Sequence, residues 1–140
     1  MNLLRAPHRS VLAYGVFDVL NAKEIKFLKT LQRLGNEVII GCRSDHLIAS
    51  QGRPCLNSFT KRRRTLESCR FVSRVIPEET RDQKRIDIVN YDVSALVLAD
   101  SEAGNYDDLQ DIVKILYISD GKMPESRPHI VLPALNLAIG

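Results

Sequence analysis

The stretch that decides the fold is Ala13-Tyr14-Gly15-Val16-Phe17-Asp18-Val19-Leu20-Asn21-Ala22-Lys23-Glu24-Ile25. Its first residues belong to an apolar run, Val11 to Phe17, that is typical of a buried strand. Its last residue, Ile25, is the first of four apolar residues at helical spacing, followed by Leu28, Leu31 and Leu34. The pattern therefore predicts a strand that leads into an amphipathic helix, which is the front half of a βαβ unit.

Strand and helix signals alternate along the rest of the chain. Four more strands are predicted at Glu37–Cys42, Arg74–Ile76 (stopped by Pro77), Ala95–Leu98 and Ile112–Ile118. Helices are predicted from Asn57 or Ser58 to about Cys69, from the capping-box spacing Thr80–Gln83 to about Tyr91, and over Tyr106–Asp111. Gly35 is expected to cap the first helix, and Arg43–Leu56 to form a loop over a ligand crevice.

This alternation predicts one doubly wound, Rossmann-like α/β domain with a five-stranded parallel sheet. We expect a single domain over residues 1–140, with its core at about 10–118 and a C-terminal tail over 119–140. Ligands of such sheets bind at the carboxyl ends of the strands, where a helix N-terminus favours phosphate. The site is therefore expected near Gly15 to Glu24.

Composition limits the function classes. The 140 residues are 44% hydrophobic with a net charge of +3, which suits a phosphate-bearing ligand but is too weak to indicate nucleic acid. The three cysteines, Cys42, Cys55 and Cys69, suggest neither a zinc site nor a disulfide framework, and we expect no bound metal. The apolar stretch Ile130–Ile139 is about half as long as the roughly 20 residues of a membrane span. A cytoplasmic protein without a membrane span is expected.

Residues Tyr14 to Leu20 resemble the opening of the glycerol-3-phosphate cytidylyltransferases, members of the nucleotidyltransferase superfamily, which have roughly Tyr-Gly-x-Phe-Asp-Leu-Leu-His-x-Gly-His-Ile. The resemblance covers about Val11 to Ile118. Further matches are Leu34-Gly35, Ser44-Asp45, Arg62, Arg70-Phe71-Val72, Val75-Ile76-Pro77-Glu78, Gln83-Lys84, Asp87-Ile88, Gly104 and Tyr106-Asp107. The resemblance implies a fold of the cytidylyltransferase type and a nucleotide site at Gly15, Phe17, Asp18, Asn21, Glu24 and Asp100.

The chain departs from the family where the phosphates should bind. Asn21-Ala22-Lys23-Glu24 stands in place of His-x-Gly-His, and Gln51 in place of a lysine used on substrate and phosphates. The family's arginine in the segment that grips the triphosphate corresponds to Asp120. Because the chemistry needs donors aimed at the α-phosphate, these changes predict loss of catalysis.

The replaced motif has an ordinary structural explanation. Asn21 and Glu24 have the spacing of a capping box, in which Asn21 caps the helix and Glu24 reaches back to the Asn21 amide. The carboxylate of Glu24 would also favour the positive end of the helix dipole. On this interpretation the phosphate site has become a helix start, and Glu24 stabilises the fold.

Arginines are the candidates for binding a substrate phosphate. Arg62 and Arg70 match positions at which the family binds that phosphate or orders the site, and Arg53 lies close to Gln51. Basic residues on a helix more often form a solvated face, and Arg62 stands within the basic run Lys61-Arg62-Arg63-Arg64. Both interpretations stay open at this point.

The leading expectation is a cytidylyltransferase-like protein that is catalytically degenerate and has a binding, scaffolding or regulatory role. No cofactor is certain, and a nucleotide or phosphorylated small molecule is the expected ligand. The alternative is a working enzyme that transfers CMP from CTP, with Mg²⁺, to glycerol 3-phosphate, using Lys23, Arg53, Arg62 and Lys122. A homodimer is also expected, through Arg70-Phe71-Val72 or the apolar tail Ile130-Val131-Leu132-Pro133-Ala134-Leu135.

Overall fold

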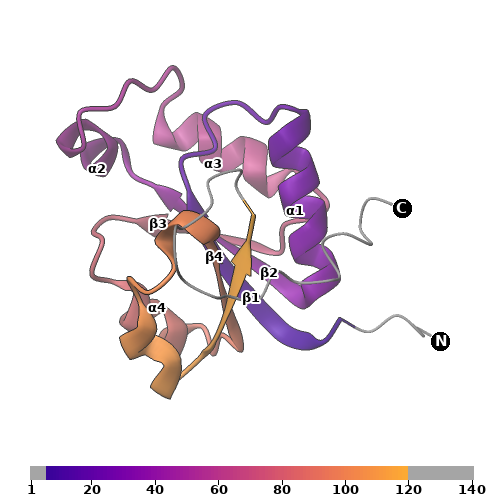
Figure 1. Ribbon diagram of the computed structural model, residues 1–140. Coiled ribbons are helices and arrows are strands. Elements are labelled where there is room, and N and C mark those ends of the chain that lie inside the picture. The colour runs from indigo at the N-terminus through magenta and orange to yellow at the C-terminus, as the bar shows by residue number, and fades with distance from the viewer. Residues whose placement is uncertain (1–5, 120–140) are drawn as a thin grey trace.

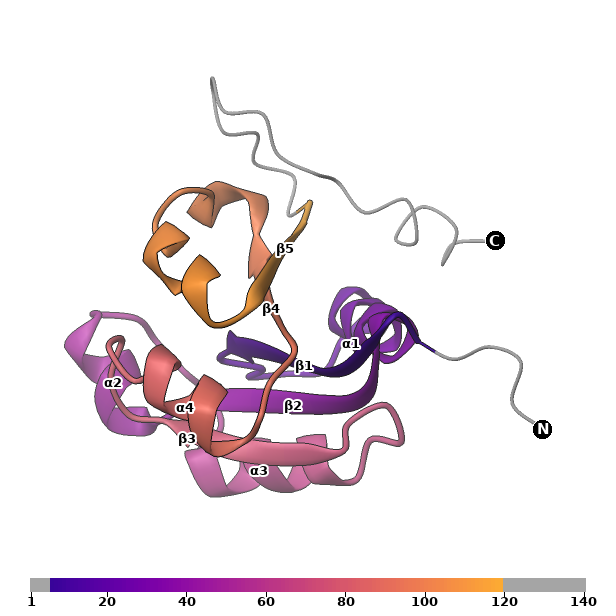
Figure 2. The same cartoon turned by 90° about the horizontal axis from the view of Figure 1, so that it is seen from below.

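The computed structural model describes residues 6–119, so predictions that concern the tail from residue 120 onward lie outside the described residues. A five-stranded parallel sheet forms the centre of the molecule, in the order β3-β2-β1-β4-β5 (Figures 1 and 2). The strands are β1 His8–Gly15, β2 Gly35–Arg43, β3 Arg74–Glu78, β4 Ala95–Ala99 and β5 Lys114–Ile118. The predicted Rossmann-like fold is thereby confirmed.

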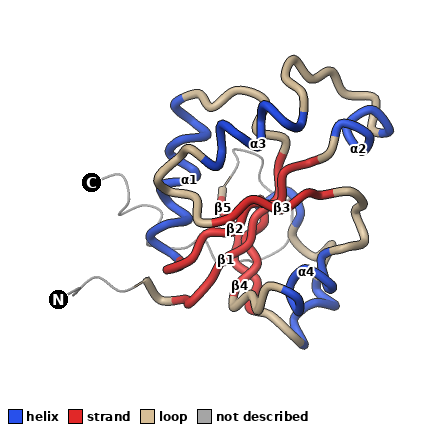
Figure 3. Tube along the Cα trace, turned by 180° about the vertical axis from the view of Figure 1, so that it is seen from behind, coloured by secondary structure: helices blue, strands red, loops and turns tan. Residues whose placement is uncertain are grey.

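Helices cover both faces of the sheet. They are α1 Ala22–Leu34, α2 Asp45–Ser50, α3 Phe59–Glu67 and α4 Lys84–Asn90, with short 3₁₀ helices η1 Asp100–Glu102 and η2 Asp107–Asp111. Helices α1 and α3 lie on one side of the strands and α4 on the other (Figure 3). Successive residues of β1 point to opposite faces of the sheet, since Val11 belongs to the same apolar cluster as Leu28 of α1, and Leu12 to the same cluster as Ile88 of α4. Two apolar layers therefore hold the sheet, as expected for buried parallel strands.

The order of the strands creates a switch point. The chain builds outward from β1 through β2 to β3, and then returns to place β4 on the other side of β1. Crevices for ligands open at such points, beyond the carboxyl ends of the diverging strands. Among residues 6–119 no helix is long and apolar enough to cross a membrane.

The sequence missed α2. The segment Arg43–Leu56 was expected to be a loop, but Asp45–Ser50 is helical, and the Ser44 hydroxyl accepts a hydrogen bond from the Leu47 amide at 3.1 Å. Ser44 is a typical N-cap residue, so the signal was present in the sequence. Pro77 was expected to end its strand and instead lies within β3, where an edge position tolerates the missing N–H.

Gly35 is the C-cap of α1, as predicted, and its amide donates a hydrogen bond to the Leu31 carbonyl. Its φ of −135° is extended, not left-handed, and it already belongs to β2. A Cβ at this position would lie 2.8 Å from the γ-carbons of Val11 in the adjacent strand. Glycine is therefore required here by the close approach of β1 and β2, and not by a left-handed cap conformation.

Candidate functional site

A crevice of about 810 Å³ opens at the carboxyl ends of the five strands and at the N-terminus of α1. Its apolar lining includes Val16, Phe17, Phe27, Val97, Leu98, Ala99 and Ile118. Its charged lining consists of the basic side chains Lys23, Lys26, Arg43, Arg81 and Lys84 and the acidic side chains Glu24, Glu78 and Glu102. Concave, mostly apolar sites with a few convergent polar groups are the usual form of a small-molecule pocket.

The loop after β1 shapes the base of the crevice. Phe17 has φ of 53°, an uncommon conformation for an aromatic residue, and its ring stacks on Phe27 with centroids 6.3 Å apart. A Cβ on Gly15 would come within 2.7 Å of the Phe17 ring, so glycine leaves the space that this ring fills. Gly15 and Phe17, both predicted site residues, therefore line the crevice together. Backbone strain of this kind tends to gather at binding sites.

At the start of α1, Asn21 caps the helix as predicted, because its Oδ1 accepts a hydrogen bond from the Glu24 amide at 3.0 Å. The reciprocal half of the capping box is only partly formed, since the Asn21 amide is shared: it donates to the Val19 carbonyl at 3.0 Å and also interacts with the Glu24 carboxylate. Burial raises the pKa of Glu24, and the Asn21 amide offsets this only in part. Glu24 and Asn21 both line the crevice, with the exposed Lys23 between them.

Asp18 turns toward a neighbouring loop and is absent from the residues that line the crevice. Its carboxylate accepts hydrogen bonds from the amides of Leu56 and Asn57, at 2.8 and 2.9 Å. These hydrogen bonds, that from Leu56 foremost, lower the pKa of Asp18. Asp18 thus joins the β1–α1 loop to the segment before α3, and nucleotide binding by Asp18 stays a prediction.

Arg62 is 1% exposed and lies behind the crevice. Its Nη1 donates to the carbonyls of Val16 and Arg43, both at 2.8 Å, and its Nε donates to the Asn57 carbonyl at 3.0 Å. Its Nη2 pairs with Asp45 at 2.8 Å. The guanidinium therefore holds together the ends of β1 and β2 and the starts of α2 and α3. This position is not a solvated face, and the donors of Arg62 are used within the protein, which agrees with the expected role of ordering the site rather than binding the phosphate.

The remaining candidates lie apart from the crevice lining. Arg53 borders a smaller hollow of about 300 Å³, together with Asp45 and Cys55. Arg70 is exposed, with its guanidinium 5.0 Å from the ring centroid of Phe71. Asp100 is fully buried at the start of η1, directly after β4. Binding roles for these three residues stay predictions.

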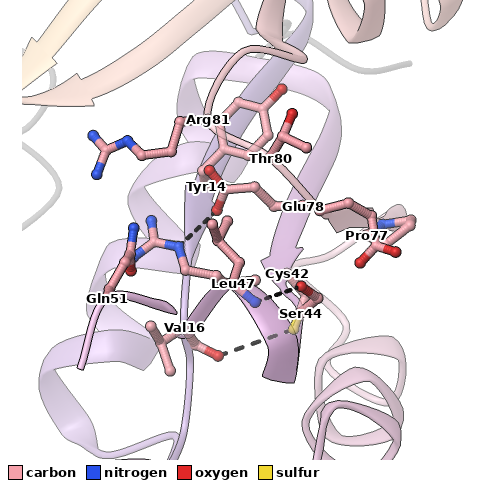
Figure 4. A network of polar contacts seen from close by, with 12 residues as sticks. Tyr14, Val16, Cys42, Ser44, Leu47, Gln51, Pro77, Glu78, Thr80 and Arg81 are labelled. Carbon is pink, nitrogen blue, oxygen red and sulfur yellow. Dashed lines mark hydrogen bonds and ion pairs between the residues drawn. The ribbon is translucent and has the colours of Figure 1, made fainter. Parts of the chain in front are cut away.

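The wall opposite α1 was not singled out as a site from the sequence. Lys84, at the start of α4, is 6% exposed, and its ammonium lies 4.6 Å from the ring centroid of Tyr14 and 4.5 Å from that of Tyr106. Its Nζ is 3.8 Å from Oε2 of the buried Glu78, which in turn accepts a hydrogen bond from Nε of Arg43 at 2.8 Å. Figure 4 shows Tyr14, Glu78 and Arg81 close together in this network.

Further hydrogen bonds fix the rings around Lys84. The Tyr14 hydroxyl donates to Oδ2 of Asp87 at 2.7 Å, and burial together with this bond raises the pKa of Tyr14. Nη2 of Arg81 donates to the Tyr106 hydroxyl at 3.2 Å. In the sequence, the only indication of this wall was that Val75–Glu78 and Gln83-Lys84 match the family. Sequence alone did not indicate that Lys84 would be buried beside two tyrosines.

No group of three His, Cys, Asp or Glu side chains that could hold a metal ion occurs within residues 6–119. The Mg²⁺ that the active alternative implies therefore has no such protein cluster in that range.

The fold, with a crevice at its switch point, defines a Rossmann-like α/β protein. Comparison with known proteins gives the family. Residues 12–133 match the family described as Cytidylyltransferase-like. The glycerol-3-phosphate cytidylyltransferase of Bacillus subtilis is 30% identical over 110 residues, which span 79% of this chain and 85% of that protein. The chain belongs to the cytidylyltransferase-like family.

Two further similarities are more distant. The FAD synthase of Pyrococcus horikoshii is 34% identical over 67 residues, covering 47% of this chain and 45% of that protein. The crystal structure of the lipopolysaccharide core biosynthesis protein from Thermoplasma volcanium superimposes with a TM-score of 0.71 at 23% identity, over 82% of this chain and 99% of the other. That structural similarity supports the fold alone.

Proposed function

We propose that this chain is a catalytically degenerate member of the cytidylyltransferase-like family that binds a phosphorylated small molecule and has a binding, scaffolding or regulatory role. The observation that carries the proposal is Lys84. Its side chain lies in the crevice wall and is 7% exposed, and its ammonium has an ion pair with Glu78 at 3.8 Å but no hydrogen bond within the described part of the chain. An ammonium has three N–H donors, and an anionic ligand in the crevice could accept hydrogen bonds from them.

The α1 side of the crevice supports the degenerate half of the proposal. Nucleotidyl transfer needs donors that stabilise the charge developing on the α-phosphate, and each donor contributes roughly 10²- to 10³-fold in rate. Asn21 uses its acceptor on the Glu24 amide, and Glu24 brings a carboxylate to the crevice. Loss of two histidines and a lysine would together cost on the order of 10⁶-fold if the effects added.

The relatives suggest the first probe. Three of them are named glycerol-3-phosphate cytidylyltransferase, so glycerol 3-phosphate is the phosphorylated molecule to test first. Titration calorimetry on the full chain should detect binding of glycerol 3-phosphate, with glycerol as the matched control that lacks the phosphate. If neither glycerol 3-phosphate nor inorganic phosphate binds, the ligand class is wrong.

Catalysis is tested by release of pyrophosphate. The purified full chain is incubated with Mg²⁺, glycerol 3-phosphate and each nucleoside triphosphate in turn, beside an active relative at the same concentration. We expect no release above background from this chain. Turnover within a hundredfold of the active relative would contradict degeneracy and favour the alternative, transfer of CMP from CTP to glycerol 3-phosphate or a similar phosphorylated alcohol.

The residues named for that alternative have different surroundings. Lys23 lines the crevice, Arg53 borders the smaller hollow, Arg62 is buried by its own partners, and Lys122 lies outside the described residues. The homodimer and the cytoplasmic location also stay predictions. Light scattering at micromolar concentration tests the homodimer, and a monomer mass would contradict it.

A further inference from the structure

We infer that Arg43 is an anion-binding residue of the crevice and that it acts with Lys84 as a two-cation site for one phosphate group, both cations being positioned by Glu78. The inference rests on the proposed function, since it names the residues that would recognise the phosphate. Sequence analysis pointed to Arg53 as the nearby charge, whereas the geometry points to Arg43.

The parallel sheet brings the site together. Arg43 is the last residue of β2 and Glu78 the last of β3, and the register of the two strands pairs these two residues directly. Because the carboxyl ends of parallel strands meet at one edge, both side chains reach the same end of the sheet. Lys84, at the first turn of α4, comes to the same place from the helix that follows β3.

Glu78 serves both cations with separate oxygens. It is 1% exposed, and its Oε1 accepts a hydrogen bond from Nε of Arg43 at 2.8 Å while its Oε2 lies 3.8 Å from Nζ of Lys84. A buried carboxylate needs such partners to remain charged. The trio carries two positive charges and one negative charge, so one net positive charge remains at the crevice wall. Glu78 is thus a positioning residue.

The guanidinium of Arg43 has N–H donors that remain available to a ligand. Nε is used on Glu78, and Nη1 has only a long hydrogen bond, 3.4 Å, to Oε1 of Gln51. Nη2 has no hydrogen-bond acceptor anywhere in residues 6–119, although the side chain is only 17% exposed and lines the crevice. A fixed guanidinium with an open edge matches the oxygens of a phosphate.

The backbone of Arg43 is held as firmly as its side chain. Its carbonyl accepts a hydrogen bond from Nη1 of Arg62 at 2.8 Å, so the buried arginine behind the crevice fixes the base from which Arg43 extends. Gln51, the residue in the position of the family's loop lysine, contacts the far end of the Arg43 guanidinium. The cation at this part of the crevice therefore comes from β2, whereas Arg53 borders the separate hollow.

The test uses inorganic phosphate and glycerol 3-phosphate as probes on the full chain. Arg43→Gln should weaken binding of both at least tenfold in calorimetry. Arg64→Gln, which removes an exposed arginine of α3, is the matched control and should change affinity less than twofold. Arg53→Gln separates the two arginines: a loss confined to Arg53→Gln would overturn the inference and restore the sequence-based candidate.

Two further measurements keep the outcome clear if Arg43→Gln folds poorly. Arg43→Lys retains a cation beside Glu78 but lacks the forked donors, and it should still weaken phosphate binding by at least threefold. In the wild-type protein, the guanidinium resonances of Arg43 should shift in a saturable way on addition of phosphate. Binding by wild type with unshifted resonances and unchanged affinity in Arg43→Lys overturns the inference alone. Absence of any phosphate binding by wild type overturns the proposed function and the inference together.

Discussion

Two buried cations, from helices on opposite faces of the sheet, show how differently the protein uses charge. Arg62 of α3 gives its donors to three backbone carbonyls and the carboxylate of Asp45. Lys84 of α4 lies against two tyrosine rings and makes no hydrogen bond within residues 6–119. Both are more than nine-tenths buried, yet the first completes the fold and the second faces a crevice.

The difference gives a rule for interpreting this family member. A buried charge whose donors are taken by the protein contributes to stability, because removing it leaves several acceptors without partners. A buried charge with donors to spare, in a cavity wall, is suited to a ligand. The same contrast separates two carboxylates near α1, since amide hydrogen bonds lower the pKa of Asp18 whereas burial raises that of Glu24.

The largest expected effect is on Arg62. Arg62→Met should lower the free energy of unfolding by about 3 to 5 kcal/mol, because the carbonyls of Val16, Arg43 and Asn57 lose their donor. Urea denaturation would measure this. Arg63→Met on the same helix removes a half-exposed arginine and should change stability by less than about 0.5 kcal/mol. A variant at position 62 that keeps its stability but loses phosphate binding would reverse the assignment.

The next largest effect is on the affinity for phosphate, and it distinguishes the wall of the crevice at Lys84 from the wall at α1. Lys84→Met should weaken binding of inorganic phosphate by about tenfold or more, as expected for loss of a charge-assisted hydrogen bond. Lys23→Met, on the α1 wall beside Glu24, should change the same affinity less than threefold. Calorimetry on both variants gives the comparison. If Lys23→Met causes the larger loss of affinity, phosphate binds at the start of α1, and the segment that replaces the family's His-x-Gly-His motif still forms a phosphate site.

The smallest effect concerns the charge of Glu24 and depends on pH. Its pKa is raised above the ordinary 4.5 in the folded protein, chiefly by burial, so ionisation is disfavoured on folding. The contribution of protonated Glu24 to the free energy of unfolding is fully present below pH 4.5. It is lost as the pH rises through the higher pKa of Glu24 in the folded protein. Relative to Glu24→Gln, the wild type should therefore lose stability, by less than about 1 kcal/mol, between pH 4 and pH 7.

Urea midpoints at several pH values would measure this difference. The complete capping box expected from the sequence would have the opposite effect, because it would stabilise the ionised carboxylate. If the wild type instead becomes more stable relative to Glu24→Gln as the pH rises, the helix dipole and the Asn21 amide outweigh burial.

Local features could be predicted from the sequence because their causes are local. Asn21 caps α1 through a residue three positions away, and the apolar stripe of that helix is buried as its spacing indicates. Ser44 offered the same kind of signal, but short helices such as α2 are easily missed among loop residues. Gly35 showed the limit of such signals, because the requirement for glycine came from Val11 in another strand.

By itself the sequence determined the alternation of strands and helices, the buried parallel sheet, the start of α1 and the family. Periodicity and capping act within a few residues, so they can be recognised without coordinates. Only the tertiary structure decided that Arg62 binds three carbonyls and that Arg43, Glu78 and Lys84 meet at the crevice. Those contacts join residues as many as 46 positions apart, and burial and strand register, which exist only in the folded chain, set which donors remain for a ligand.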